Sequence, residues 1–271
     1  MAFGERHQEI QELVHRQGFV SIESLAQHFD VTPQTIRRDI NILSRQGLLR
    51  RYHGGAGLPS SVENVAYATR QVICLEEKRR IARLVAEHIP DEASLFLNIG
   101  TTTEEVARAL TGKRGLRVIT NNLNVAAILA ESESAEVTVA GGLMRKRDRA
   151  IIGEATINFI GQFKVDYGVI GISAIDPDGT LLDFDFREVQ VSKAIIESAR
   201  HVFLVTDHTK FSRSALVRLG DVSLIDAIFT DQPLPASLAA RFAETEIAVH
   251  VAPPIPQGVP SQSQKALASK V

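Results

Sequence analysis

The sequence predicts an α/β protein that consists of a small, largely helical N-terminal domain and a larger domain built on a mostly parallel sheet. Three observations support this expectation. The beginning of the chain carries apolar residues at helical spacing, a later stretch alternates strand-like and helix-like runs, and a region without a clear period separates them. We therefore expect a small domain at 1–57, a linker at 58–75, a larger domain at 76–252 and a disordered tail at 253–271.

Length and charge limit the classes of protein that fit. The chain has 271 residues, with 30 Lys and Arg against 32 Asp and Glu, so any nucleic-acid site must be local. The single cysteine, Cys74, allows no internal disulfide and indicates no zinc site, and we expect neither a metal nor another cofactor. Because we recognise no signal peptide and no membrane-spanning run, we expect a cytoplasmic protein.

Two helices open the small domain. Gly18 is expected to end the first, and Ser21 stands at the capping position of the second, where a hydroxyl can accept a backbone N–H. Both segments carry apolar residues at helical spacing, which predicts that they pack against each other. These residues are Ile10, Leu13 and Val14 in the first helix and Leu25, Ala26 and Phe29 in the second.

A third helix follows a tight turn. Thr32 can cap it, and Pro33 fits its first turn, where a missing N–H costs nothing. Ile36, Ile40 and Leu43 share one face, so the opposite face points outward at 3.6 residues per turn. This outward face offers amide and guanidinium groups, which pair with base edges and phosphates when a helix enters the major groove. It carries Gln34, Arg38, Asn41 and Arg45, flanked by Thr35 and Arg37.

The segment LLRRYHGGAGL (48–58) predicts a basic hairpin with a glycine tip, a wing that lies against the DNA backbone. From residue 31 to residue 57 there are five arginines and one acid, a local balance of +4. The alternative is a helical module for protein–protein contacts with a solvated charged face. For the DNA interface we expect contacts from Thr32, Gln34, Thr35, Arg37, Arg38, Asn41, Arg45, Arg50, Arg51 and His53.

Seven runs rich in Val and Ile predict the strands of the larger domain. Continuous apolar strands that alternate with helices indicate a mostly parallel sheet covered on both faces. The runs are 94–100, 116–122, 136–142, 165–173, 201–207, 226–231 and 246–252, and an amphipathic helix is expected at 184–200.

Polar loops follow three of these strands, and ligands of parallel sheets bind beyond the carboxyl ends of strands. The first loop combines Gly100 with the threonines 101–103 at a helix N-terminus, which suits a phosphate but is equally typical of helix capping. The second ends in two asparagines, which suit a hydroxyl or phosphate oxygen or else a turn. The third loop contains Gly141. Because all three loops follow strands, we expect them to share one effector site, made of Gly100, Thr101, Thr102, Thr103, Asn121, Asn122 and Gly141.

A later strand ends in VTDHTKF, which adds charge to this edge of the sheet. Lys210 can neutralise a ligand phosphate while Asp207 positions the ligand or accepts a hydroxyl. The alternative is an exposed local ion pair of little energetic value. We include both residues in the expected effector site.

The segment VSIESLAQHFDVTPQTIRRDINILSRQGLLRRYHGGA (20–56) closely resembles the winged helix-turn-helix of DeoR-type bacterial transcriptional regulators. The resemblance extends to about residue 252 through IGTTTEEVARAL, VITNNLNVA, IIGEATINFI, GVIGISAID and VTDHTKF. It implies an effector domain similar to sugar-phosphate isomerases of the ribose-5-phosphate isomerase type, which binds a phosphorylated metabolite without turnover. It further implies a homo-oligomeric repressor, a dimer or tetramer, that binds operator DNA of glycerol-metabolism genes and is released by sn-glycerol 3-phosphate.

Three alternatives remain open at this point. The regulator could respond to another sugar phosphate, or could activate rather than repress. A protein of another class, a sugar-phosphate isomerase with an appended DNA-binding domain, would use Asp207, Glu188 and Lys210 as acid–base groups.

Overall fold

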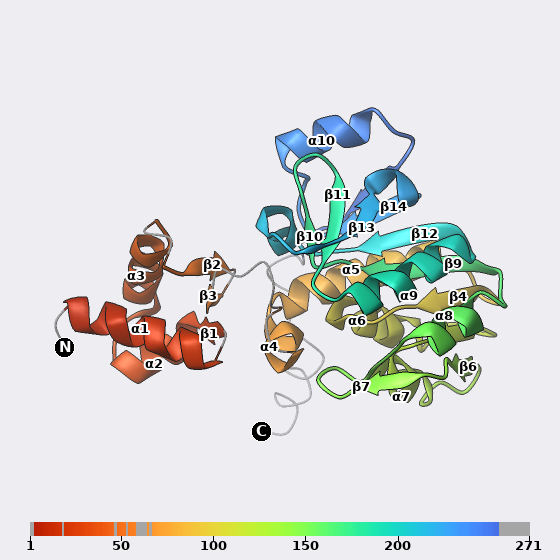
Figure 1. Cartoon of the computed structure of the whole chain (residues 1–271), viewed down its shortest axis with the longest axis horizontal. Coiled ribbons are helices and arrows are strands. Elements are labelled where there is room, and N and C mark those ends of the chain that lie inside the picture. The colour runs from red at the N-terminus through yellow and green to blue at the C-terminus, as the bar shows by residue number, and fades with distance from the viewer. Residues whose placement is uncertain are drawn as a thin grey trace, which may run out of the picture.

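The computed structural model of the chain places a small N-terminal domain beside a larger one (Figure 1). It describes residues 3–17, 19–45, 48–52, 54–57, 64 and 67–254. Several positions named above lie outside the described residues, namely Gly18, His53, residues 58–63 and 65–66 of the expected linker, and residues 255–271 of the expected tail.

Three helices and a small sheet form the N-terminal domain, which we call the head. Its helices pack around one apolar core that contains Ile10, Leu25 and Ile36, as the helical spacing predicts. The Ser21 hydroxyl accepts the backbone N–H of Ser24 at 3.0 Å, so the predicted cap of the second helix is confirmed. The elements are α1 (Phe3–Gln17), β1 (Phe19–Ser21), α2 (Ile22–Phe29), α3 (Pro33–Arg45), β2 (Arg50–Tyr52) and β3 (Gly55–Gly57).

Strands β2 and β3 form the predicted wing. They pair antiparallel with Tyr52 opposite Gly55, and Gly54 turns the chain at φ +85°, where a glycine meets no steric penalty. Strand β3 also pairs with β1, which the sequence did not predict. A Cβ on Gly55 would lie 2.3 Å from the backbone oxygen of Val20. The wing is therefore held closely against the rest of the head.

A seven-stranded sheet forms the centre of the larger domain, in the order β15-β14-β12-β9-β4-β5-β6. Every neighbouring pair is parallel, and each strand overlaps one of the seven predicted runs, so the predicted sheet is confirmed. The strands are β4 (Ser94–Leu97), β5 (Arg117–Thr120), β6 (Glu136–Val139), β9 (Val165–Gly171), β12 (Ala199–Val205), β14 (Ala227–Thr230) and β15 (Ala248–Val251).

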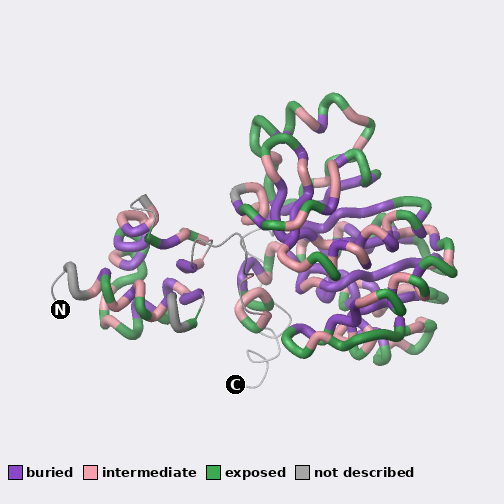
Figure 2. The backbone as a smooth tube through the Cα atoms, viewed as in Figure 1, coloured by how far each residue is buried: buried purple, intermediate pink, exposed green. Residues whose placement is uncertain are grey.

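Helices cover both faces of this sheet, because successive side chains of each strand point to opposite faces. Leu95 and Leu97 pack in one apolar cluster, and Phe96 packs in the other. Figure 2 shows the strands as buried segments between more exposed helices. The first cluster includes α5 (Leu75–His88), α6 (Thr101–Leu110) and α7 (Leu123–Leu129), and the second includes α8 (Glu154–Ile160), α9 (Phe186–Glu197) and α10 (Ala236–Ala243).

Smaller elements that the sequence did not predict surround the carboxyl end of the sheet. Helix α4 (Tyr67–Val72) lies within the range expected to be a linker, and α5 follows it closely. The remaining elements are the hairpin β7 (Leu143–Arg145) and β8 (Ala150–Ile152), the antiparallel strands β10 (Ala174–Ile175), β11 (Thr180–Asp183) and β13 (Val217–Asp221), and the 3₁₀ helices η1 (His208–Ser212) and η2 (Val222–Leu224).

The head meets the larger domain at the turn between α4 and α5. Phe19 and Tyr52 of the head pack in one apolar cluster with Ile73 and Cys74 of this turn. The two aromatic rings meet edge to face, with their centroids 5.9 Å apart. This turn is therefore a point at which a change in one domain can reach the other. In the described part of the chain, no helix has the length and apolarity that a bilayer crossing requires.

Candidate functional sites

Helix α3 presents a polar face to solvent because its apolar residues are used in the core. Ile36, Ile40 and Leu43 are at most 1% exposed. At the start of the helix, the Thr32 hydroxyl accepts the backbone N–H of Thr35 at 3.3 Å, which confirms the predicted cap. The N-terminal turns of α3 are thus free to approach a duplex from outside.

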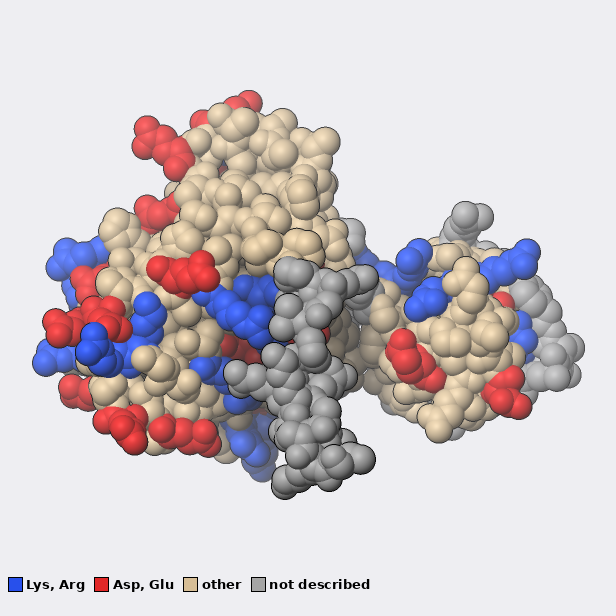
Figure 3. All heavy atoms as spheres, turned by 180° about the vertical axis from the view of Figure 1, so that it is seen from behind, with Lys and Arg blue, Asp and Glu red and all other residues tan. Residues whose placement is uncertain are grey.

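Most of the predicted DNA-binding residues share this outer side of the head. Gln34, Arg37 and Arg38 are exposed, and Arg51 of the wing donates to Asn41 Oδ1 at 2.9 Å, which joins the wing to the helix. In Figure 3, basic side chains gather along the side of the head that carries α3 and β2. Thr32 is also exposed, Thr35 and Arg50 are half-buried, and the Arg45 side chain and His53 lie outside the described residues.

The acid of this helix does not reduce the basic charge of the outer face. Asp39 is 1% exposed and points toward α1. Its carboxylate accepts Arg6 Nε at 2.7 Å and lies 3.1 Å from His7 Nε2. Since Asp39 is paired inside the head, the outward residues of α3 present cations and amides, as backbone and base contacts require.

The larger domain contains a cavity beyond the carboxyl ends of β4, β9 and β12. This position is the one at which parallel sheets bind ligands. Four of the lining side chains are cationic and three are carboxylates. The lining comprises Asn64, Arg70, Lys78, Ile99, Gly100, Thr101, Thr102, Gly171, Ile172, Ser173, Asp183, Glu188, Val205, Thr206, Asp207, Lys210 and Arg213.

The N-terminus of α6 forms one part of the cavity wall. Gly100 precedes the helix at φ +146° and provides no side-chain cap, and Thr101 and Thr102 follow in the wall. Backbone N–H groups at such a terminus attract an anion. Thr103 does not line the cavity, because its hydroxyl donates to the backbone oxygen of Asn98 at 2.7 Å.

Two lysines, the buried Lys78 and the half-buried Lys210, lie near this terminus. Burial lowers the pKa of Lys78 to about 8 and also lowers the pKa of Lys210. Lys210 Nζ lies 3.5 Å from Asp207 Oδ2. Although burial alone would raise it, the two lysines and hydrogen bonds from Thr209 lower the pKa of Asp207 to about 2. The group therefore combines two lysines with one carboxylate, which leaves positive charge for an anionic ligand.

Arg213 adds a buried guanidinium group to the same side. It is 4% exposed, and its Nη2 donates to Asn64 Oδ1 at 2.7 Å. Its Nε–H has no hydrogen-bond acceptor among the described residues. Burial lowers the pKa of this group, which reflects the cost of holding a cation there. A ligand oxygen would satisfy both the buried donor and its charge.

The opposite side of the cavity is acidic. Asp183 of β11 accepts the Ser173 hydroxyl at 2.9 Å and the Phe184 backbone N–H at 2.7 Å. Burial raises the pKa of Asp183, and burial together with the nearby Asp183 raises the pKa of Glu188 to about 7. These two carboxyl groups therefore retain protons more readily than exposed ones.

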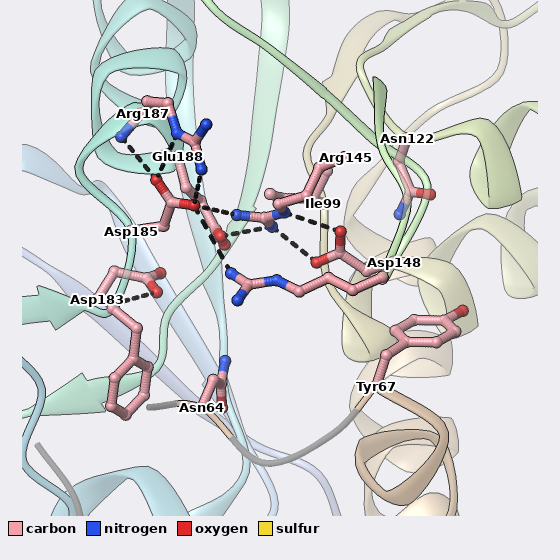
Figure 4. Close-up of polar contacts among 12 residues, drawn as sticks. Asn64, Tyr67, Ile99, Asn122, Arg145, Asp148, Asp183, Asp185, Arg187 and Glu188 are labelled. Carbon is pink, nitrogen blue, oxygen red and sulfur yellow. Dashed lines mark hydrogen bonds and ion pairs between the residues drawn. The ribbon is translucent and has the colours of Figure 1, made fainter. Parts of the chain in front are cut away.

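The Arg145 side chain of β7 contacts the Glu188 carboxylate, as Figure 4 shows. Its Nη2 lies 2.7 Å from both Glu188 Oε2 and Asp148 Oδ2, and its Nη1 lies 2.9 Å from Asp185 Oδ2. The Arg145 side chain is 8% exposed. This buried ion-pair group ties the β7–β8 hairpin to the start of α9 and fixes the acidic wall.

Besides Thr103, three predicted effector residues do not line the cavity. Asn121 donates to the backbone oxygen of Ile151 at 3.0 Å, and Asn122 accepts the backbone N–H of Asn124 at 2.9 Å as the cap of α7. Gly141 accepts the hydroxyl of Thr156 at 2.9 Å. These contacts belong to the ends of β5 and β6, whereas the cavity lies at β4, β9 and β12. The predicted residues that do line it are Gly100, Thr101, Thr102, Asp207 and Lys210.

Sequence reasoning missed Arg70, Lys78, Asp183 and Arg213. Only Lys78 left a signal, because it interrupts the apolar stripe of α5 that continues through Ile81, Ala82 and Val85. A charged residue in such a stripe must find a buried partner. The other three come from loops and short elements whose position depends on the tertiary fold.

Two family models match the chain: a DeoR-like helix-turn-helix domain matches residues 6–62, and a DeoR C terminal sensor domain matches residues 73–232. The glycerol-3-phosphate regulon repressor of Escherichia coli is 54% identical over 234 residues, 86% of this chain and 93% of that protein. The corresponding repressor of Haemophilus influenzae is 55% identical and covers 83% of this chain and 88% of its own length.

The larger domain also has distant neighbours among solved structures. A D-ribose-5-phosphate isomerase in complex with phospho-erythronic acid aligns with a TM-score of 0.38 and 16% identity, covering 51% of this chain and 54% of that chain.

Proposed function

Since the chain belongs to the DeoR family of DNA-binding transcriptional regulators, we propose that it represses genes of glycerol and glycerol 3-phosphate metabolism by binding their operator DNA. One observation carries the proposal: an exposed basic helix and a buried cation-lined cavity occur in one chain that is 54% identical to a glycerol-3-phosphate regulon repressor across both domains. A homo-oligomer would place two heads on operator half-sites about one helical turn apart.

The ligand that best fits the cavity within this proposal is sn-glycerol 3-phosphate. Its phosphate would lie against the N-terminus of α6, where Lys78, Lys210 and Arg213 supply positive charge and donors. The ligand acts as an inducer only if it binds more tightly to the conformation that has low affinity for DNA.

We propose binding without turnover, in keeping with the curated repressors that the chain resembles. Asp207 is a weak base at a pKa of about 2, and Arg145 donates to the Glu188 carboxylate. One observation favours the isomerase alternative, namely that Glu188 has a pKa of about 7 and lines the cavity. Turnover of ribose 5-phosphate by the purified chain would support that alternative.

The contacts of Lys78 offer a route from the ligand to the head. Its Nζ donates to the backbone oxygens of Arg70 and Ile73, at the end of α4. Ile73 in turn packs against Phe19 and Tyr52 of the head. A phosphate that draws the lysine into the cavity would weaken its hold on this turn. We therefore propose that the inducer shifts the heads through the turn between α4 and α5.

Operator binding tests the proposed function. Fluorescence anisotropy at a fixed, stated salt concentration would measure the affinity for fragments upstream of glycerol-utilisation genes. We expect sn-glycerol 3-phosphate to release the DNA, whereas glycerol and inorganic phosphate do not. Binding to DNA that ignores sn-glycerol 3-phosphate would refute this inducer, and no specific DNA binding would refute the repressor itself.

A pair of substitutions tests the route to the head. Ile73→Ala removes the side chain that packs against the head, whereas Val72→Ala alters a neighbour that is 67% exposed. We expect Ile73→Ala to bind both operator and ligand while the ligand reduces operator affinity several-fold less than in the wild type. Val72→Ala should behave as the wild type. If the ligand released operator DNA equally from both variants, the coupling between ligand and head would not run through Ile73.

A further inference from the structure

The two walls of the cavity carry opposite charge and belong to opposite faces of the sheet. Lys78 projects from α5, which packs on one face, and Glu188 projects from α9, which packs on the other. Lys210 and Arg213 follow the carboxyl end of β12 near Asp207, and the Arg213 guanidinium also lies 4.7 Å over the ring of Phe184, the neighbour of Asp183. Arg70 also lines the cavity, and its Nη2 lies 3.6 Å from Asp148 Oδ2.

In the acidic wall, burial outweighs the nearby Arg145 and Arg70 and raises the pKa of both carboxyl groups. Asp183 is 5% exposed, and the Glu188 side chain is 15% exposed. Arg145 contacts Glu188 but also pairs with Asp148 and Asp185, so one guanidinium is shared among three carboxylates. Because burial raises the pKa of both carboxyl groups, a ligand carboxylate placed against this wall would either meet like charge or have to bind together with a proton, and both cost binding free energy. A hydroxyl group could instead donate a hydrogen bond to a carboxyl oxygen.

This asymmetry bears on ligand choice, which the phosphate alone does not decide. Resting on the proposed function of the same cavity, we propose that Asp183 and Glu188 select phosphomonoesters whose far end carries hydroxyl groups and reject those that carry a second anionic group there. The cationic wall then supplies affinity for the phosphate, and the acidic wall supplies the discrimination.

Two matched pairs of ligands test the proposal by titration calorimetry on the full chain. sn-Glycerol 3-phosphate and 3-phospho-D-glycerate differ by a hydroxymethyl group against a carboxylate, and so do glucitol 6-phosphate and 6-phosphogluconate. Within the pair that binds, we expect the compound with the carboxylate to bind with at least about tenfold lower affinity, because like-charge juxtaposition costs several kcal/mol. Because two pairs are used, the proposed selection rule, discrimination against a second anionic group, can be tested whichever compound is the inducer.

Charge-neutral variants of the acidic wall test whether its carboxyl groups cause the lower affinity of the carboxylate compound. In Glu188→Gln and in Asp183→Asn, we expect the compound with the carboxylate to bind more tightly. The ratio of the two ligand affinities, within the pair of compounds that binds, should then narrow several-fold. Lys146→Gln is the matched control, since Lys146 is exposed beside the Arg145 group but does not line the cavity. Its ratio should equal that of the wild type.

The outcomes separate this inference from the proposed function. Binding of sn-glycerol 3-phosphate and 3-phospho-D-glycerate with equal affinity would overturn the selection rule and leave the phosphate site standing. An unchanged ratio in both neutral variants would overturn the assignment to Asp183 and Glu188. If only the six-carbon pair binds and shows the expected ratio, the selection rule is supported while the inducer proposal fails. Absence of binding by all four compounds would overturn both.

Discussion

The head and the larger domain both use positive charge, but they place it in opposite ways. In the head, Arg37, Arg38 and Arg51 are exposed on one side, and the acid of the same helix is turned inward. In the larger domain, Lys78 and Arg213 are at most 4% exposed and line the cavity. Exposed cations suit a long polyanion that meets the surface from outside, whereas buried cations suit one small anion that must be desolvated.

The comparison predicts different physical behaviour for the two sites. Exposed charges are screened by salt and keep their ordinary protonation, so the head should respond to ionic strength and little to pH. Buried lysines pay a desolvation cost that lowers their pKa, so the cavity should respond to pH and little to salt. A change at one site can therefore be followed in both the operator affinity and the ligand affinity.

Loss of a buried cation should have the largest effect. For Lys210→Ala, we expect the affinity for sn-glycerol 3-phosphate to fall about 30-fold or more, because truncation of a buried charge partner costs about 2–5 kcal/mol. Repression in the absence of ligand should survive. Calorimetry and operator anisotropy measure the two affinities, with the exposed Lys146→Ala as control. An unchanged inducer response would remove Lys210 from the site.

Loss of an exposed cation on the outer face of α3 should have the next largest effect. Arg38→Ala should weaken operator binding by about 1–3 kcal/mol, about 5- to 150-fold, and leave ligand binding intact. Arg83 of α5 is exposed far from α3 in the chain, and Arg83→Ala serves as the control. Equal loss of DNA and ligand binding in Arg38→Ala would indicate misfolding and contradict the assignment of α3.

A pH profile should distinguish the sites by a smaller, several-fold effect. Lys78 has a pKa of about 8, depressed by burial despite Asp207, with Lys210, Cys74 and Arg70 also nearby. A phosphate monoester becomes dianionic above about pH 6. Ligand affinity should therefore rise toward pH 7 and fall above pH 8, where Lys78 loses its charge.

Calorimetry between pH 6 and pH 9, in buffers of different ionisation enthalpy, would show proton uptake on binding above pH 8. Operator affinity should change little over the same range, because arginines stay charged. A ligand affinity that is flat from pH 7 to pH 9 would exclude Lys78 as a charge partner of the phosphate.

Salt dependence should give the smallest effect. Arg51→Ala should reduce the slope of log operator affinity against log salt by about one. Ligand affinity should depend only weakly on salt in both proteins, since buried charges are screened less. A steep salt dependence of ligand binding would mean that the phosphate is held at the surface, against the cavity described above.

The same contrast explains what the sequence could predict. The solvent-facing side of α3 follows from one local period, because Ile36, Ile40 and Leu43 define the inner face and leave the rest outside. The seven strands follow likewise from apolar runs. Strand ends also located Gly100 and Lys210, since the carboxyl ends of parallel strands converge.

The rest of the cavity depends on contacts between distant segments. Arg70 and Arg213 reach it from elements that only the tertiary fold brings together. Asn121 and Asn122 follow a strand as expected, but their amides are used in holding β8 and capping α7. The backbone takes up the Asn121 amide N–H and the Asn122 amide oxygen, whereas Asn121 Oδ1 has no hydrogen-bond partner among the described residues.

The most direct test of the account is whether the two sites are thermodynamically linked. Calorimetry would measure the affinity for sn-glycerol 3-phosphate with and without saturating operator DNA. Because linkage is reciprocal, DNA should weaken ligand binding by the same factor by which ligand weakens DNA binding. Equal ligand affinity in the presence and absence of DNA would contradict the account, since the buried cations of the cavity would then have no influence on the exposed cations of the head.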